Sequence, residues 1–349
     1  MQKPGPSADE KTLKKSVLLV TAFAAFLTPF LGSALNLALP SISKDLNVSA
    51  IELGWIASSF ILSSAIFLLP LGRLADITGR KKIFTWGIVL FTLSTFLIVF
   101  SWNFESLLIF RIIQGIAGAM IFGTSLAIIT SVFGPGERGR AMGINITAVY
   151  AGLSGGPVIG GLLTQYFGWR SIFAFLVPFG IVCLYLIFKK MKPEWAEAKG
   201  EKFDWQGSVI YGVSLASFMY GFSKLPSAAG WIFLGSGIVL GFVFLLFEKG
   251  VSNPVFDIKL VLNNRIFAFS NLAALINYAA TFGITFVLSL YLQFVKGLSP
   301  RDAGFYLVTQ PIFMALMASF SGRLSDKYDS GILASIGMSI IVAGLIVIT

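Results

Sequence analysis

Long apolar runs alternate with short polar connections along almost the whole chain. A helix needs about 20 mostly apolar residues to cross a bilayer, and eleven runs come close to that length. The expected spans are residues 16–38, 51–72, 83–101, 106–132, 141–163, 170–188, 206–222, 231–248, 266–292, 301–322 and 331–349. Spans 206–222 and 231–248 are short. The pattern predicts an all-α, polytopic membrane protein with about eleven transmembrane helices.

The composition supports this class and excludes several kinds of chemistry. Of the 349 residues, 56% are hydrophobic and 12% are charged, whereas soluble domains carry about 25% charged residues. The chain has no histidine and one cysteine, Cys183. Histidine-based catalysis, a cysteine-type zinc site and an internal disulfide are therefore excluded. We expect neither an enzyme nor a cofactor.

The positions of the charges indicate an orientation. With the N-terminus in the cytoplasm, 20 of the 26 Lys and Arg residues fall on cytoplasmic connections, five fall outside, and Arg111 lies inside a span. This asymmetry follows the positive-inside rule, and it places the longest connection, 189–205, in the cytoplasm. The net charge of +10 thus reflects membrane topology, not nucleic-acid binding. The polar N-terminus shows no cleavage site, so we expect an integral protein of the cell membrane.

Two nearly identical pentapeptides lie 250 positions apart, GRLAD at 72–76 and GRLSD at 322–326. Shifting the first three spans by 250 residues places them on the ninth, tenth and eleventh spans. Internal duplication of this kind is typical of secondary transporters. We therefore divide the chain into a six-helix bundle at 1–188, a cytoplasmic loop with two linker helices at 189–250, and the first three helices of a second bundle at 251–349.

Several motifs carry a resemblance to a known family. GRLADITGRKK at 72–82, RIIQGIAGA at 111–119 and GLSGGPVIGG at 152–161 resemble the loop, fourth-helix and exporter fifth-helix motifs of the major facilitator superfamily. FDWQG at 203–207 and NLALP at 36–40 are similar to its fourteen-span drug-exporter branch. The resemblance implies two rocking six-helix bundles. Since the second bundle has three spans here, we expect a chain truncated after the eleventh span, inactive or unstable alone.

Both copies of the pentapeptide are candidates for a conformational latch. Gly72 and Gly79 permit a tight turn, and Asp76 can accept hydrogen bonds from a helix N-terminus, where the partial charge is positive. The basic run 80–82 would face the cytoplasm. These residues could serve topology alone, but the resemblance implies a latch between the halves, with each copy docked on the fifth helix of the other half. The expected latch residues are Gly72, Arg73, Asp76, Gly79, Arg80, Gly322, Arg323 and Asp326.

Gly152, Gly156 and Gly160 recur every four residues and therefore share one helical face. A face without side chains lets two helix backbones approach closely, and Pro157 removes one backbone hydrogen bond there. Ordinary packing would explain the pattern. The resemblance implies in addition that this face, with Gly161, seals the interface between the halves in exporters.

Arg111 is the one charge well inside a span, so it should face a cavity or a partner. Asn36 lies at a similar depth, which predicts an Arg111–Asn36 hydrogen bond, and Gln114 is one turn away. This group could hold helices together or serve substrate or proton passage. Asn277 and Thr281 begin a polar stripe on the ninth span that could line the same path, with Phe26, Phe30 and Phe282 as apolar walls.

The sequence favours a secondary active exporter of small lipophilic compounds, working by alternating access. Two alternatives stay open: a facilitator or symporter for a polar metabolite, and a non-transporting scaffold or receptor. A proton or ion gradient is a candidate partner. The stretch 30–35 of the first span contains no carboxylate, and no span interior holds Asp or Glu, so we expect proton coupling to be weak or indirect.

Overall fold

The computed structural model describes residues 8–191, 193–325 and 328–348, and every regular element within them is helical. The elements in chain order are α1 (Ala8–Leu46), α2 (Ala50–Thr78), α3 (Arg80–Val99), α4 (Phe104–Val132), α5 (Pro135–Phe167), α6 (Arg170–Lys190), α7 (Trp205–Ser223), α8 (Ala228–Glu248), α9 (Ile258–Asn263), α10 (Arg265–Leu290), the π-helix η1 (Tyr291–Val295), α11 (Pro300–Leu307), α12 (Thr309–Ser325) and α13 (Ser330–Ile348). The all-α fold is thereby confirmed.

Helix starts follow from the local sequence. A capping box starts α2: Ser49 N–H donates to Glu52 Oε2 at 2.7 Å, and Glu52 N–H donates to Ser49 Oγ at 3.4 Å. A second box, between Asn103 and Ser106, starts α4. These caps satisfy backbone donors that the first helical turn leaves without a partner.

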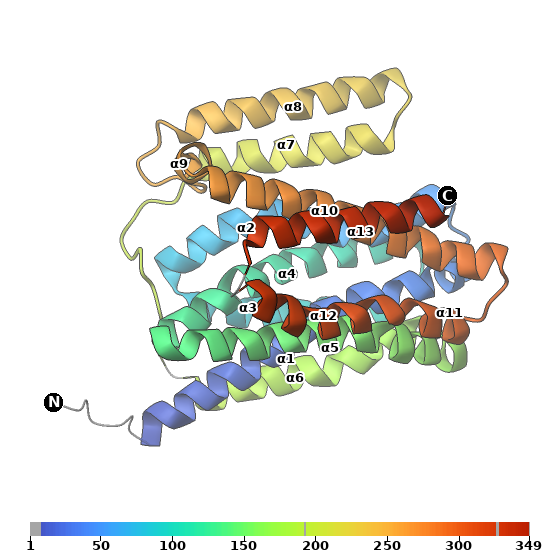
Figure 1. The fold of residues 1–349 in the computed structure, drawn as a ribbon, viewed down its shortest axis with the longest axis horizontal. Coiled ribbons are helices and arrows are strands. Elements are labelled where there is room, and N and C mark those ends of the chain that lie inside the picture. The colour runs from blue at the N-terminus through green and yellow to red at the C-terminus, as the bar shows by residue number, and fades with distance from the viewer. Residues whose placement is uncertain (1–7, 192, 326–327, 349) are drawn as a thin grey trace.

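Helices α1–α6 form a bundle around one apolar core (Figure 1). Helix α1 packs along α5 and α6, while α4 packs on α2 and α3. Large aromatic side chains that are at most 1% exposed fill the centre, namely Phe30, Phe84, Phe91 and Phe173. The contiguous core explains why these six helices hold their places as one unit.

Helices α7 and α8 form a hairpin on the outside of α2 (Figure 1). The two helices approach closely at Gly237, where a side chain would not fit. A Cβ at this position would lie 2.6 Å from the backbone nitrogen of Phe218. Ser214 Oγ donates to the Gly237 carbonyl at 2.8 Å, and Tyr211 Oη donates to the Ala65 carbonyl at 3.0 Å. The second bond attaches the hairpin to α2.

The segment after the hairpin packs on the bundle through α1 and α5, which contact α10, α11 and α12. The expected continuous span at 301–322 is wrong: it consists of α11 and α12, with Val308 between them. Pro311 explains the break, since proline lacks the N–H that would bond to the Leu307 carbonyl and its ring crowds that group. A small second cluster of Leu37, Ala303 and Leu307 lies at this junction.

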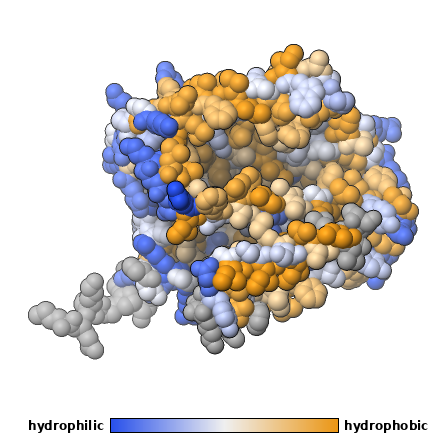
Figure 2. Space-filling view, turned by 45° about the horizontal axis from the view of Figure 1, so that its top comes forward, coloured by the Kyte–Doolittle hydropathy of each residue, from blue (hydrophilic) through white to orange (hydrophobic). Residues whose placement is uncertain are grey.

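The surface matches a protein that lies in a membrane. Within the described residues, eight helices are long and apolar enough to cross a bilayer: α1–α6, α8, and α10 together with η1. Apolar residues cover the middle of the face in Figure 2, which is hollowed, and hydrophilic residues gather toward opposite ends. Helices α7, α12 and α13, which correspond to other expected spans, are not among those eight.

Candidate functional site

The connection between α6 and α7 folds across the turn that joins α2 to α3. We call residues 193–204 the strap, and Figure 1 shows it running along one end of the bundle to α7. Two backbone hydrogen bonds attach it: Arg80 N–H donates to the Trp195 carbonyl at 2.7 Å, and Ala198 N–H donates to the Asp76 carbonyl at 2.9 Å. The strap therefore covers the first copy of the expected latch.

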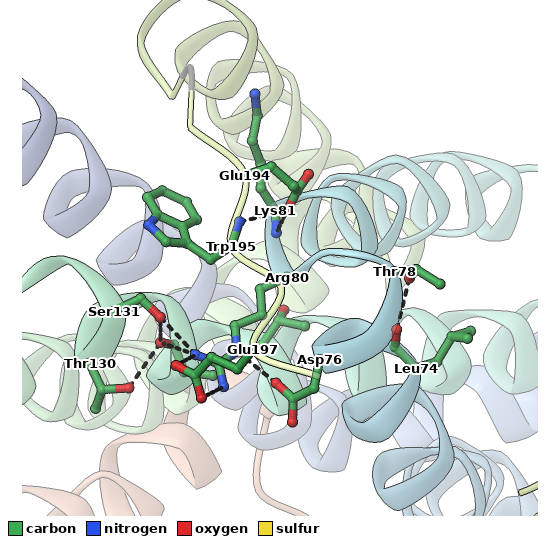
Figure 3. Close-up of polar contacts among 12 residues, drawn as sticks. Leu74, Asp76, Thr78, Arg80, Lys81, Thr130, Ser131, Glu194, Trp195 and Glu197 are labelled. Carbon is green, nitrogen blue, oxygen red and sulfur yellow. Dashed lines mark hydrogen bonds and ion pairs between the residues drawn. The ribbon is translucent and has the colours of Figure 1, made fainter. Parts of the chain in front are cut away.

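Arg80 is the centre of this contact (Figure 3). Its Nε donates to Asp76 Oδ1 at 2.7 Å, and its Nη1 and Nη2 donate to the two oxygens of Glu197 at 2.6 and 2.8 Å. Nη1 also reaches Ser131 Oγ on α4 at 2.7 Å. The residue is 6% exposed, so the expectation that the Arg80 side chain is open to the solvent is wrong. Its charge is balanced by carboxylates, which makes burial tolerable.

The N-terminus of α3 has its own carboxylate partner. Glu194 Oε1 accepts from the Lys81 N–H at 2.8 Å, and Glu194 Oε2 accepts from the Lys82 N–H at 3.1 Å. A carboxylate is favoured there by the partial positive charge of the helix end. Asp76, expected in such a role, bonds Arg80 instead. Gly79 is required at the turn, since its φ is +125° and a Cβ would lie 2.5 Å from Glu194 Cδ.

Two further latch residues lie beside this cluster. Arg73 forms an ion pair with Glu201 of the strap, and the Cα of Gly72 lies 3.4 Å from where a Cβ on Gly123 of α4 would stand. The Arg80 guanidinium, by hydrogen bonding and then by its charge, lowers the pKa of Glu197 below its ordinary value. The acidic strap and the basic turn are thus complementary.

The second copy of the pentapeptide is described only in part. Gly322 and Arg323 belong to α12, but their side-chain surroundings and Asp326 lie outside the described residues. The expected docking of this copy stays a prediction. Helices α11 and α12 do both contact α5.

Arg111 is 2% exposed and its partners differ from those expected. Its Nε donates to the Ile56 carbonyl at 3.2 Å, its Nη1 donates to Gln114 Oε1 at 2.7 Å, and its guanidinium lies 4.7 Å from the centre of the Phe60 ring. The predicted bond to Asn36 is wrong within the described residues, because Arg111 turns toward α2. Gln114 continues the network to Thr95 Oγ1 on α3 at 2.7 Å.

The bare face of α5 lies against α1. A Cβ on Gly152 would lie 2.6 Å from the Phe26 carbonyl oxygen, one on Gly156 would lie 1.8 Å from Ser33 Oγ, and one on Gly160 would lie 2.5 Å from Ala34 Cβ. Close backbone packing was predicted and is present. In these three contacts α5 packs against α1, a helix of the same bundle. This face of α5 therefore does not form the contact with the later helices α10–α12, which we call the seam.

The seam uses the adjoining face of α5. A Cβ on Gly161 would lie 2.6 Å from the Pro300 carbonyl oxygen of α11, and a Cβ on Gly304 would lie 2.3 Å from the Pro157 carbonyl oxygen of α5. Each helix thus presents a Pro-x-x-x-Gly element, at 157–161 and 300–304, and each glycine faces the proline carbonyl of the other element.

Polar contacts also join α10 to α1 and α12. Ser289 Oγ donates to the Asn36 carbonyl of α1 at 2.8 Å, and Thr285 Oγ1 lies 2.9 Å from both Thr281 O of its own helix and Gln310 Oε1 of α12. Asn36 is 9% exposed, and Asn277 and Thr281 are half-buried. The aromatic residues expected as apolar walls of the path, Phe26, Phe30 and Phe282, do not all lie beside these contacts.

Phe30 is fully buried in the bundle core, with its ring centre 5.5 Å from that of Phe175. It therefore cannot line an open path. Phe26 stacks on it at 5.3 Å, whereas Phe282 on α10 is exposed.

Sequence reasoning missed several polar residues of these contacts. Glu194, Glu197 and Glu201 lie in a connection that was read only for its lysines, although their spacing of three and four residues was a usable signal. Ser289 and the buried Glu248 lie near the ends of apolar runs and gave no distinctive pattern. Glu248 is 3% exposed.

Comparison with known proteins places this geometry in a family. The model of the Major Facilitator Superfamily matches residues 21–349. The riboflavin transporter RibZ of Clostridioides difficile (strain 630) is 30% identical over 315 residues, covering 90% of this chain and 68% of the relative. The tetracenomycin C resistance and export protein of Streptomyces glaucescens is 28% identical over 334 residues, covering 94% and 62%. This chain therefore spans about two thirds of the length of these relatives.

Solved structures support the fold. A peptide transporter POT in complex with sulfate matches with a TM-score of 0.66 at 15% identity, covering 92% of this chain and 73% of that one. A D-xylose–proton symporter matches with a TM-score of 0.60 at 15% identity, covering 90% and 69%. The family match over nearly the whole chain and the shared helical fold agree, and the protein is a member of the Major Facilitator Superfamily.

Proposed function

We propose that the protein exports small, mostly lipophilic compounds across the cell membrane by alternating access. The observation that carries this proposal is a line of polar contacts along α10, where Ser289 bonds the Asn36 carbonyl of α1 and Thr285 bonds Gln310 of α12 between otherwise apolar helices. A mostly apolar passage with a few polar groups suits ligands of that kind. The resistance and export function in the name of the Streptomyces glaucescens relative supports the same class.

In this proposal the Arg80 cluster is the latch of the cytoplasmic end. The strap closes over the α2–α3 turn through Glu194, which accepts from backbone N–H groups, and through the ion pairs of Glu197 and Glu201, and these contacts hold that end of the first bundle in one arrangement. Rocking of the bundles separates groups at this end, since alternating access moves one bundle against the other. The strap thereby adds loop carboxylates to a latch that the resemblance assigned to the turn alone.

A second candidate is transport of a polar metabolite. It is favoured by the riboflavin transporter among the relatives and by the several hydrogen-bonding groups on α1 and α10. A scaffold or receptor without transport is the third candidate. The Arg80 latch disfavours it, because a static scaffold gains nothing from a contact that must break and re-form.

Inverted membrane vesicles that contain the protein separate these candidates. We expect uptake of a lipophilic fluorescent dye, reduced by Arg80→Lys, with little uptake of riboflavin. Preferential uptake of riboflavin would favour the metabolite candidate, and equal signals in vesicles with and without the protein would favour the scaffold. Dye uptake with and without a proton gradient then tests the prediction of weak coupling.

A further inference from the structure

Two carboxylates meet at the base of the α7–α8 hairpin. Asp204 is the N-cap of α7, and its Oδ1 accepts from the Gly207 N–H at 2.9 Å. Its second oxygen, Oδ2, is buried without a hydrogen-bond partner in the described part of the chain. Glu248 ends α8, is 3% exposed, and has no partner for either carboxylate oxygen there. Three carboxylate oxygens are therefore buried and unpaired in one place.

Gly207 shows how close these groups are. A Cβ at this position would lie 2.2 Å from Asp204 Oδ2 and 2.6 Å from Glu248 Oε1. Both oxygens thus point into the same small space beside the first turn of α7, which is open because Gly207 has no side chain. The FDWQG stretch at 203–207 supplies Asp204 and Gly207, so this motif builds the pair together with the end of α8.

Nearby charges do not neutralise the pair. Arg73, on α2, forms its ion pair with Glu201, and Lys202 and Lys249, which are close in sequence, are exposed to solvent. The backbone N–H groups of Val255 and Phe256 approach Glu248 from the connection after α8. Asp204 is the charged group that acts on Glu248.

Two ionised carboxylates in such a place repel each other and lose their hydration. A single shared proton removes one charge and forms an O–H···O⁻ hydrogen bond, which is short and strong. We propose that Asp204 and Glu248 form a proton-binding site in which one proton bridges the two carboxyl groups and holds the strap end of α7 against α8. The site lies apart from the proposed substrate path on α1 and α10.

The strap connects this site to the latch. Asp204 is the last strap residue, and Glu197, seven positions earlier, binds Arg80. When a rise in pH removes the shared proton to solvent, the two carboxylates carry like charges and Asp204 moves away from α8. The strap then loses its attachment to α8 and separates from the α2–α3 turn more readily. Proton occupancy at the hairpin base thus controls how firmly the latch is covered.

Infrared spectroscopy detects the bridging proton directly. We expect the purified protein in lipid nanodiscs at neutral pH to show a carbonyl band of a protonated carboxyl group, and Glu248→Gln and Asp204→Asn each to lack it. Glu105→Gln is the control, because Glu105 is exposed at the start of α4 and should leave the band unchanged. A band that persists in both pair variants, or that is absent from the unmodified protein, would overturn the proposal.

A second measurement keeps the test independent of that band. Ala198 belongs to the strap and is 7% exposed, whereas Lys199 beside it is exposed. In a Cys183→Ala background, the labelling rate of Ala198→Cys is divided by that of Lys199→Cys, which cancels the pH dependence of the thiol itself. Between about pH 5 and about pH 9, the upper end of which reaches the pKa of the most strongly shifted buried glutamates, we expect this ratio to rise several-fold. With Glu248→Gln, whose neutral amide imitates the protonated acid, the ratio should stay low.

The outcomes separate the proton from a bound cation and from the proposed function. An equal rise of the ratio in Glu248→Gln would overturn the proposal. So would a carboxyl band that Na⁺ removes at constant pH, since it would identify a cation site. Neither measurement depends on transport. A failure of dye uptake would therefore contradict the proposed function without bearing on the proton-binding site.

Discussion

Arg80 and Glu197 form a two-pronged ion pair between a buried guanidinium and an exposed carboxylate. The Arg80 side chain is 8% exposed and that of Glu197 is 67% exposed, so the strap reaches the arginine from the solvent side. Both oxygens of Glu197 are engaged, at 2.6 and 2.8 Å, a geometry that the planar guanidinium matches with two parallel N–H groups. The partner that can leave is therefore the glutamate, and the arginine stays in place with Asp76.

Glu197→Gln should loosen the strap while the bundle stays folded. The amide keeps one hydrogen bond but loses the charge, and exposed ion pairs of this kind contribute at most about 1 kcal/mol. We expect the labelling ratio of Ala198→Cys to Lys199→Cys to increase by up to about fivefold. Glu105→Gln provides the matched control. An unchanged ratio in Glu197→Gln would show that the backbone bonds alone hold the strap.

The same ion pair predicts a response to acid. Arg80 lowers the pKa of Glu197 in the folded protein, so the pair stabilises the strap fully above the ordinary pKa of glutamate, about 4.3. That contribution is lost as the pH falls through the lower, folded-state value. We expect strong acidification to release the strap in the unmodified protein. In Glu197→Gln, acidification should cause no further release, because the titrating carboxylate is absent. Release that begins near neutral pH on acidification would contradict this assignment.

Gly156→Ala should disrupt the contact between α1 and α5. The new methyl group would lie 1.8 Å from Ser33 Oγ and 2.7 Å from the Phe30 carbonyl oxygen, and overpacking of this kind costs about 1–3 kcal/mol. Gly155→Ala is a close control, because its nearest neighbour would be 3.7 Å away. Thermal unfolding in detergent should give a lower midpoint for Gly156→Ala only. Gly156→Leu should in addition abolish transport, with the protein still inserted.

The orientation of the chain can be tested with two exposed positions. Lys199 lies in the strap and Lys224 lies at the end of α7, and both are exposed. In intact cells, a membrane-impermeant thiol reagent should label Lys224→Cys and leave Lys199→Cys unlabelled until the membrane is opened. Labelling of Lys199→Cys from outside would reverse the predicted topology.

The helical layout was predictable because apolar runs of spanning length leave few alternatives. Helices lie at each expected span. The break at Val308 was not predictable, since hydropathy does not register the hydrogen bond that Pro311 cannot make. The depth of Arg111 in its span predicted that it would be buried and paired. Depth does not say which neighbouring helix it faces, so Asn36 was the wrong partner.

The strap was beyond sequence reasoning for a different reason. Its glutamates have meaning only where the connection crosses the α2–α3 turn, and that crossing depends on contacts between residues more than 100 positions apart, such as Arg80 and Glu197. The pair of Asp204 and Glu248 is similar, because Asp204 precedes the first residue of α7 and Glu248 is the last residue of α8, so the two meet only when the hairpin forms. Hydrophobic patterning specifies which helices form, whereas these sites depend on which helix ends meet.

The reciprocal contact between α5 and α11 makes one end of the molecule suited to turning. Gly161 faces the Pro300 carbonyl and Gly304 faces the Pro157 carbonyl, so two stretches of backbone meet with no side chain between them. At these two points a rotation therefore meets no interlocked side chains. Pro157 and Gly161 lie in the half of α5 remote from its start at Pro135, and that start follows the α4 end where Ser131 contacts Arg80. We therefore expect this contact to act as the fulcrum of the rocking motion, and the resistance to opening to reside in the strap at the opposite end.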